Sequence, residues 1–172
     1  EKGNVDDVVT TGRNAYGVPG TSIYLSLGEK AKLQDLLYGL MLASGNDAAA
    51  ALAGLDPGGE EAFVEKMNQK AAYLGLENTH FKNPSGLDGE NHHTTALELA
   101  KLTAYALEND FFAEMVATQQ IQVAGRWLSN HNRLLKDLGA CGVKTGFTKA
   151  CGRCLVSAKE QNGRLLICVT LN

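Results

Sequence analysis

The spacing of apolar residues changes twice along this 172-residue chain, and the change sets the fold class. Residues 5–27 are rich in turn residues and alternate apolar with other side chains at Ile23, Leu25 and Leu27, which is typical of a strand. From Lys32 the apolar residues follow a helical repeat, and after about residue 118 the alternation returns. A helical block between pieces of antiparallel sheet predicts an α+β fold.

Five helices are expected in the mostly helical block, residues 28–117. The first carries an apolar stripe formed by Leu33, Leu36, Leu37, Leu40 and Met41. Ser44-Gly45-Asn46 interrupts it, and an alanine-rich helix follows. An amphipathic helix is expected over residues 60–74. The capping box Thr95-x-x-Glu98 predicts a helix to about residue 109, and Asp110 is expected to cap a short helix that ends near residue 116.

Antiparallel strands are expected in residues 118–172, and the last two read as a hairpin with Asn162-Gly163 as its turn. This turn pairs Gln161 with Arg164, so that Cys154 faces Leu171 and Ser157 faces Cys168. Because side chains alternate along a strand, Cys154 and Cys168 point to opposite faces of the sheet and cannot form a disulfide.

Four cysteines are present, and two of them have the Cys-x-x-Cys spacing of redox and zinc sites. They are Cys141, Cys151, Cys154 and Cys168. No second Cys-x-x-Cys pair exists for zinc, and the pair leads into a strand instead of the helix of a thioredoxin-like site. We therefore expect small buried or half-buried cysteines, without zinc or redox chemistry.

Composition excludes several classes of function. The net charge is −3, no run of basic residues occurs, and aromatic residues make up 6%, which argues against nucleic-acid binding. No apolar stretch approaches the roughly 20 residues that span a bilayer. The opening "EKGNVDDVVTT" lacks Met and a signal peptide, so we expect a processed or trimmed product.

Two triplets combine residue types that regular elements rarely place together. Ser44-Gly45-Asn46 can be a plain helix boundary, with Gly45 ending one helix and Asn46 or Asp47 capping the next. Lys144-Thr145-Gly146 can be an edge strand whose lysine prevents aggregation and whose glycine marks a bulge. Each triplet taken alone is a weak signal.

Taken together, the two triplets resemble the second and third motifs of the serine penicillin-binding proteins. The segments "GEKAKLQDLLYGLMLASGNDAAAALA", "NQKAAYLGLENTHFKNPSGLD", "TTALELAKL" and "GVKTGFTKACGRCLVSA" narrow this resemblance. They are similar to the low-molecular-weight D-alanyl-D-alanine carboxypeptidases of the sporulation and vegetative Gram-positive type. The resemblance covers nearly the whole chain.

The resemblance implies a partial transpeptidase fold of the penicillin-binding-protein and β-lactamase type. It implies a serine enzyme that removes the terminal D-Ala from peptidoglycan stem peptides through an acyl-enzyme and is inhibited by β-lactams. The full-length protein would be extracytoplasmic, secreted or membrane-associated at the cell envelope, and it would need no cofactor.

The resemblance also implies site roles. Lys144 and Thr145 would bind the substrate carboxylate, and Gly146 would leave room for the substrate backbone. The backbone N–H of Phe147 would serve the oxyanion hole. Ser44 would pass a proton to the leaving amine, and the Asn46 amide would hold the peptide carbonyl and the neighbouring lysine.

The chain departs from the family pattern because it has no Ser-x-x-Lys. The residues three positions after its six serines are Leu25, Glu29, Asp47, Asp88, Asn132 and Glu160. We therefore expect residues 1–172 to be a single truncated domain that lacks the nucleophile motif, the first strands and the last helix, and to be inactive alone. Such a domain should expose the apolar stripe and one edge of the last strand, which favours self-association or local rearrangement.

Other functions remain open at this point. The chain could be a non-catalytic module that binds peptidoglycan peptide or a protein partner. A class A β-lactamase is less favoured because Ser44-Gly45-Asn46 replaces its Ser-Asp-Asn and its Glu-x-x-Leu-Asn motif is absent. A zinc peptidase is less favoured still, since His92 and His93 have no helical His-Glu-x-x-His partner and are expected to pack or cap.

Overall fold

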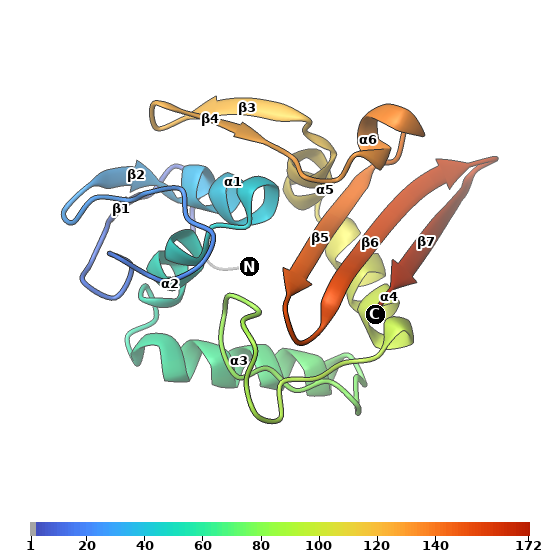
Figure 1. Cartoon of the computed structure of the whole chain (residues 1–172), viewed down its shortest axis with the longest axis horizontal. Coiled ribbons are helices and arrows are strands. Elements are labelled where there is room, and N and C mark those ends of the chain that lie inside the picture. The colour runs from blue at the N-terminus through green and yellow to red at the C-terminus, as the bar shows by residue number, and fades with distance from the viewer. Residues whose placement is uncertain (1–2) are drawn as a thin grey trace.

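A computed structural model describes residues 3–172 as helices on one side and a three-stranded sheet on the other (Figure 1). The helices are α1 (Leu33–Ala43), α2 (Asn46–Ala53), α3 (Gly59–Tyr73), α4 (Ala96–Leu107), α5 (Asp110–Ala117) and α6 (Leu134–Asp137). The strands are β1 (Val8–Thr10), β2 (Lys30–Lys32), β3 (Gln120–Val123), β4 (Arg126–Ser129), β5 (Gly142–Thr148), β6 (Gly152–Gln161) and β7 (Arg164–Thr170). Within residues 3–172 no helix has the length and apolar character needed to cross a membrane.

The five expected helices are present as α1 to α5; the predicted cap at Thr95 is confirmed, whereas the predicted cap at Asp110 is wrong. Thr95 accepts a hydrogen bond from the Glu98 N–H at 3.2 Å, whereas the Glu98 carboxylate turns away to Thr79 and the backbone of Asn78. Only half of the capping box therefore forms. Asn109, and not Asp110, caps α5 by accepting from the Phe112 N–H at 2.9 Å.

The alternating run at residues 23–27 is not a strand, contrary to the prediction from its pattern. Only β1 pairs with β2 in this part of the chain. Ile23 and Leu25 are buried, as the pattern suggested, but their N–H groups donate to the side chain of Asp47, each at 3.0 Å. The carboxylate thus takes the place of a partner strand, which a pattern of apolar residues cannot reveal.

The sheet order is β5-β6-β7, all antiparallel, and the predicted hairpin register is confirmed. Gln161 pairs with Arg164, and both turn residues between them have positive φ. All four cysteines are free. The expectation that they are buried or half-buried holds for Cys141 and Cys154, whereas Cys151, on the turn before β6, and Cys168, in the outer strand β7, are exposed.

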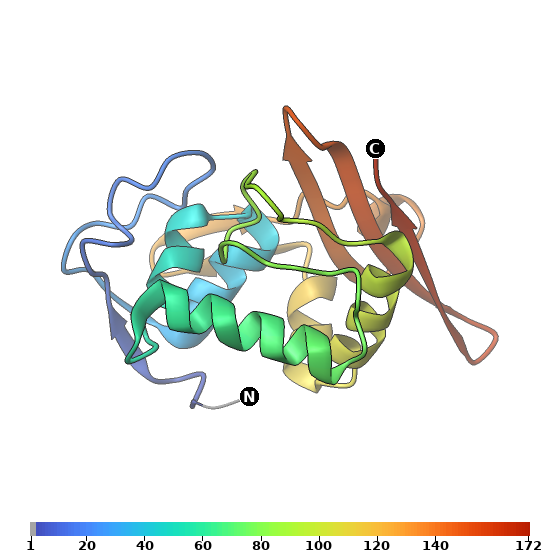
Figure 2. The ribbon, with the colours of Figure 1, turned by 90° about the horizontal axis from the view of Figure 1, so that it is seen from below.

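Helices α4 and α5 cover one face of this sheet, as the two perpendicular views show (Figures 1 and 2). Val116, Val143 and Ala158 form a small core there. A larger core lies among α1, α2, α5 and the β3-β4 hairpin. The apolar stripe of α1 faces it: Leu36 is 1% exposed and the other four stripe residues are partly buried. The expectation of a bare stripe is therefore wrong.

Candidate active site

Ser44 lies at the junction of α1 and α2, in a backbone conformation that its side chain disfavours. It ends α1 with φ of 58° and ψ of 38°, the left-handed region. Gly45 has an ordinary φ of −67° and precedes α2 as its N-cap residue. The interpretation of Gly45 as the left-handed residue, with Asn46 or Asp47 as the next cap, is therefore wrong. Serine occupies the position that glycine usually takes.

Lys144 reaches this junction from β5, the edge strand of the sheet. Its Nζ donates to Ser44 Oγ at 2.9 Å and to the Thr145 carbonyl at 2.7 Å. Burial lowers the pKa of Lys144 to about 8. The resemblance implied that Ser44 and Lys144 belong to one site, and this hydrogen bond joins them.

Asn46 is buried beside Ser44, but its amide is held by a neighbouring loop. Its Nδ2 donates to the Pro19 carbonyl at 2.8 Å. Across residues 3–172 no hydrogen bond joins Asn46 to Lys144. The structure thus joins two of the three predicted catalytic side chains, and the third, Asn46, lies two residues after Ser44 at the start of α2 with its amide bonded to Pro19.

The residues after Lys144 continue β5 without a bulge. Gly146 pairs with Cys154 in regular register, so the bulge interpretation is wrong. A Cβ added at Gly146 would lie 3.6 Å from the Cys154 Cβ, which is ordinary contact. Internal packing therefore does not require this glycine. Thr145 is half-buried, and the Phe147 side chain is 65% exposed.

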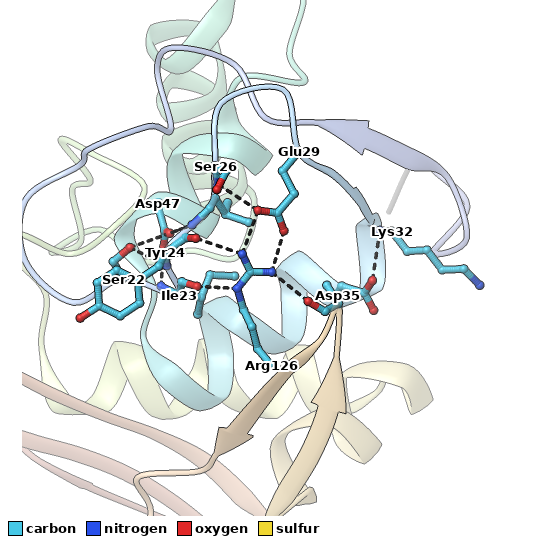
Figure 3. A network of polar contacts seen from close by, with 11 residues as sticks. Ser22, Ile23, Tyr24, Ser26, Glu29, Lys32, Asp35, Asp47 and Arg126 are labelled. Atoms are coloured by element: carbon cyan, nitrogen blue, oxygen red, sulfur yellow. Dashed lines mark hydrogen bonds and ion pairs between the residues drawn. The ribbon is translucent and has the colours of Figure 1, made fainter.

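Asp47 holds the loop that passes over the start of α2, and its role was missed from the sequence (Figure 3). The side chain is 1% exposed and accepts from Ser22 Oγ at 2.6 Å and from three backbone N–H groups. Burial alone would raise the pKa of this carboxyl, but these hydrogen bonds outweigh burial and hold the pKa below its usual range. The sequence did contain one sign of this role, since an aspartate directly before a run of alanines places a charge at the start of an apolar helix.

Arg126 fixes the same loop from the β3-β4 hairpin. Its guanidinium donates to the carbonyls of Ile23 and Tyr24 and forms a two-pronged ion pair with Glu29, at 2.6 and 2.8 Å (Figure 3). The hydrogen bond from Arg126 lowers the pKa of Glu29. Residues about 100 positions apart are joined here, which no local pattern predicts.

The segment between α3 and α4 contacts the far end of β5. Thr148 Oγ1 donates to Asp88 at 2.6 Å. His93 pairs with His80 through the backbone, and the His92 ring packs edge-on against Phe81, so both predicted histidines have packing roles. In the described part of the chain, no three His, Cys, Asp or Glu side chains are grouped to hold a metal ion.

The lowered pKa of Lys144 is directly measurable. We expect NMR of a lysine-labelled chain to show one side chain that titrates near pH 8, well below the usual lysine value of about 10.4. Burial disfavours the ammonium, so a larger share of Lys144 is neutral at pH 8 than of any exposed lysine. The Lys144→Arg variant should lose this resonance. A lysine spectrum with every group titrating above pH 10 would contradict the burial described here.

Solved structures with the same fold are penicillin-binding proteins and DD-peptidases. The Streptomyces K15 DD-transpeptidase superposes with a TM-score of 0.89 and 32% identity, over 98% of this chain and 72% of that one. Penicillin binding protein 6B from Escherichia coli gives 0.89 and 35%, over 97% of this chain and 55% of that one. The predicted transpeptidase fold is confirmed.

The family assignment rests on the whole sequence. A family profile described as "D-alanyl-D-alanine carboxypeptidase" matches residues 1–172, and the chain belongs to this serine peptidase family. The D-alanyl-D-alanine carboxypeptidase DacF of Bacillus subtilis is 39% identical over 178 aligned positions, covering 98% of this chain and 46% of that protein. The chain spans about half the length of the curated relatives it matches.

Proposed function

We propose that this chain carries the second and third catalytic motifs of a D-Ala-D-Ala carboxypeptidase that trims peptidoglycan stem peptides at the cell envelope. The observation that carries the proposal is the hydrogen bond between Lys144 and Ser44, which joins the two motifs across the edge of β5. The family membership supports the same reaction. The acylating serine is not among the six serines of residues 1–172, because none has lysine three positions later.

In the proposed reaction a serine oxygen attacks the carbonyl of the penultimate D-Ala, and the terminal D-Ala leaves as an amine. Ser44 Oγ passes a proton to that amine, and Lys144, partly neutral because its pKa is about 8, exchanges protons with Ser44. Water then hydrolyses the acyl-enzyme. β-Lactams would acylate the same serine and hold their carboxylate where the substrate holds its own.

The open edge of β5 provides the oxyanion and backbone contacts. The Thr145 carbonyl accepts from the Lys144 amine, which supports its pointing to the open edge of β5. Alternate residues of a strand direct their backbone groups to the same edge, so the Phe147 N–H would also point outward. An extended peptide could then pair with this edge as an added strand, next to Gly146.

A binding module without catalysis stays the second candidate for the chain taken alone, because Ser44 and Lys144 are present without a Ser-x-x-Lys. Self-association of the isolated chain also stays a prediction. β7 has no second strand neighbour within residues 3–172 and exposes Leu165 and Leu166, and light scattering of the isolated chain would check it.

The test of the enzyme proposal is release of D-alanine by the complete protein that contains this chain. We expect it to cleave a diacyl-Lys-D-Ala-D-Ala peptide, and the Lys144→Ala variant to lose about 10²–10³-fold in kcat/KM, the usual cost of removing one group that stabilises the transition state. Lys136→Ala, which removes an exposed lysine from α6, is the matched control and should retain activity. A complete protein that binds the peptide without releasing D-alanine would favour the binding module.

A further inference from the structure

A groove between the loop at residues 22–24 and β4 has two exposed aromatic side chains in its lining. Its volume is about 360 Å³, which lies in the range of small-molecule sites, about 300–1,000 Å³. Tyr24 is 83% exposed and Trp127 is 73% exposed. One exposed apolar side chain is ordinary, but two large aromatic rings in the lining of one groove point to a binding surface.

The backbone of Tyr24 is held in a conformation that a bulky residue rarely adopts. Its φ is 62°, in the left-handed region. Its N–H donates to Ser22 Oγ at 2.9 Å, and its carbonyl accepts from Arg126 at 2.9 Å, so hydrogen bonds on both sides fix this conformation. The ring itself points away from the Arg126 guanidinium (Figure 3). Internal packing gains little from so exposed a ring, which favours a role in binding.

Arg126 joins the two walls of this groove. It precedes Trp127 in β4, and its guanidinium donates to the carbonyls of Ile23 and Tyr24 in the loop. Both aromatic residues therefore belong to segments that are fixed to each other before a ligand arrives. A wall that is already in place reduces the conformational entropy lost on binding.

The charges in the groove favour a neutral ligand. Among the described residues that line it, Arg126 is the only Lys, Arg, Asp or Glu, and Glu29 neutralises it at 2.6 and 2.8 Å. The Ser129 hydroxyl and the His131 ring are exposed and can bond a ligand, and the His131 ring makes no hydrogen bond within residues 3–172. A sugar fits this lining, because its hydroxyls form hydrogen bonds and the C–H groups on one face of its ring pack on the electronegative face of an aromatic ring.

We propose that this groove binds a neutral N-acetylated sugar residue, with the sugar ring packed on Trp127 and bordered by Tyr24. The choice of an N-acetylated sugar rests on the proposed function, because the peptidoglycan that carries stem peptides is a polymer of N-acetylated hexosamines. Ala43 lines the groove and directly precedes Ser44, so the sugar site adjoins the pair of Ser44 and Lys144. A glycan strand bound there would lie beside the site of peptide cleavage.

The experiment titrates the complete protein that contains this chain with chitotriose, a neutral trimer of N-acetylglucosamine, and with maltotriose, a neutral trimer without acetamido groups. Calorimetry gives the affinities, and NMR follows the indole N–H signal that disappears in Trp127→Phe. We expect chitotriose to shift this signal and to bind more tightly than maltotriose. We expect Trp127→Ala to weaken chitotriose binding about tenfold, and Trp127→Phe, which keeps a smaller ring, to weaken it less.

Two further variants control for lost aromatic surface and for damage to the fold. Tyr73→Ala removes a similarly exposed ring, 79%, from the end of α3 outside the groove, and it should bind chitotriose as the unmodified protein does. Tyr24→Gly removes the ring and places glycine at a left-handed φ that suits it. It should therefore bind chitotriose more weakly while its midpoint temperature of unfolding stays the same or rises. A ring with a purely structural role would give a lower midpoint instead.

The outcomes separate the inference from the proposed function. A complete protein that releases D-alanine but binds no chitotriose would overturn the inference and leave the enzyme proposal standing. Full chitotriose affinity in Trp127→Ala would place the sugar elsewhere and would also overturn the inference. Equal binding of the two trimers would refute the assignment to an N-acetylated sugar. A protein that binds chitotriose through Trp127 but releases no D-alanine would support the groove as a sugar site and overturn the enzyme proposal.

Discussion

Replacing Asp47 by alanine is expected to lower the free energy of unfolding by about 3–5 kcal/mol, the largest stability effect that we expect from one polar side chain. The substitution leaves the N–H groups of Ile23 and Leu25 without an acceptor in a buried place, and Ser22 loses its partner. Each buried unpaired donor costs about 1–3 kcal/mol. For a domain of this size, the midpoint temperature of unfolding should fall by about 2–4 °C for each kcal/mol of lost unfolding free energy.

The same carboxylate should make stability depend on pH in a predictable direction. Its pKa is lower in the folded chain than in the unfolded chain, so its contribution is complete above about pH 4 and is lost as the pH falls through the folded value. Asp47→Asn keeps the volume and one acceptor oxygen, so it should be less destabilised than Asp47→Ala. The difference in unfolding free energy between the unmodified chain and Asp47→Asn should shrink on acidification. A constant difference from pH 7 to pH 2 would contradict this account.

Incubation of the 172-residue chain with labelled benzylpenicillin should give no stoichiometric covalent adduct. This is an all-or-none expectation, because acylation requires a serine with an adjacent general base. Ser44 is the only serine bonded to a lysine amine within residues 3–172, and we assign this pair to proton transfer to the leaving amine instead of to attack on the carbonyl. Intact-mass spectrometry measures the adduct directly.

The control for that experiment is the complete D-alanyl-D-alanine carboxypeptidase DacF of Bacillus subtilis, treated in parallel. Labelling of Ser44 to one equivalent, abolished in Ser44→Ala, would refute the assignment of Ser44 to proton transfer. Labelling of another serine would refute the expectation that none of the six serines of residues 1–172 is the nucleophile.

The fold could be predicted where regular periodicity governs local structure. The α1 stripe, the alanine-rich α2 and the β6-β7 hairpin were all predicted from spacing and turn residues. The prediction failed at residues 23–27, where burial alternates but the hydrogen bonds go to a side chain. Apolar residues at every second position therefore predict which side chains face the core. They do not predict which groups accept the hydrogen bonds of the backbone.

The candidate site also has a part that could be predicted from the sequence and a part that could not. The contact between Lys144 and Ser44 was predicted by resemblance to a family in which the two motifs meet, and the structure confirms that they do. The hydrogen bonds that fix the loop beside the site could not be predicted. Asp47 and Arg126 form them with residues that lie 22 to 103 positions away in the chain. Charged residues in isolation carry no information about their partners, and only the tertiary structure supplies it.

The left-handed backbone of Ser44 has a consequence for how this sequence can vary. A non-glycine residue in this region costs about 1 kcal/mol or more relative to glycine. Selection for thermostability alone would therefore favour glycine in place of Ser44. The hydroxyl that accepts the hydrogen bond from Lys144 would then be lost. Persistence of serine at this position across diverging descendants would record selection for chemistry acting against selection for stability. A lineage that acquires glycine here would become more stable but would lose the hydrogen bond to Lys144 and the proton transfer that we propose for Ser44.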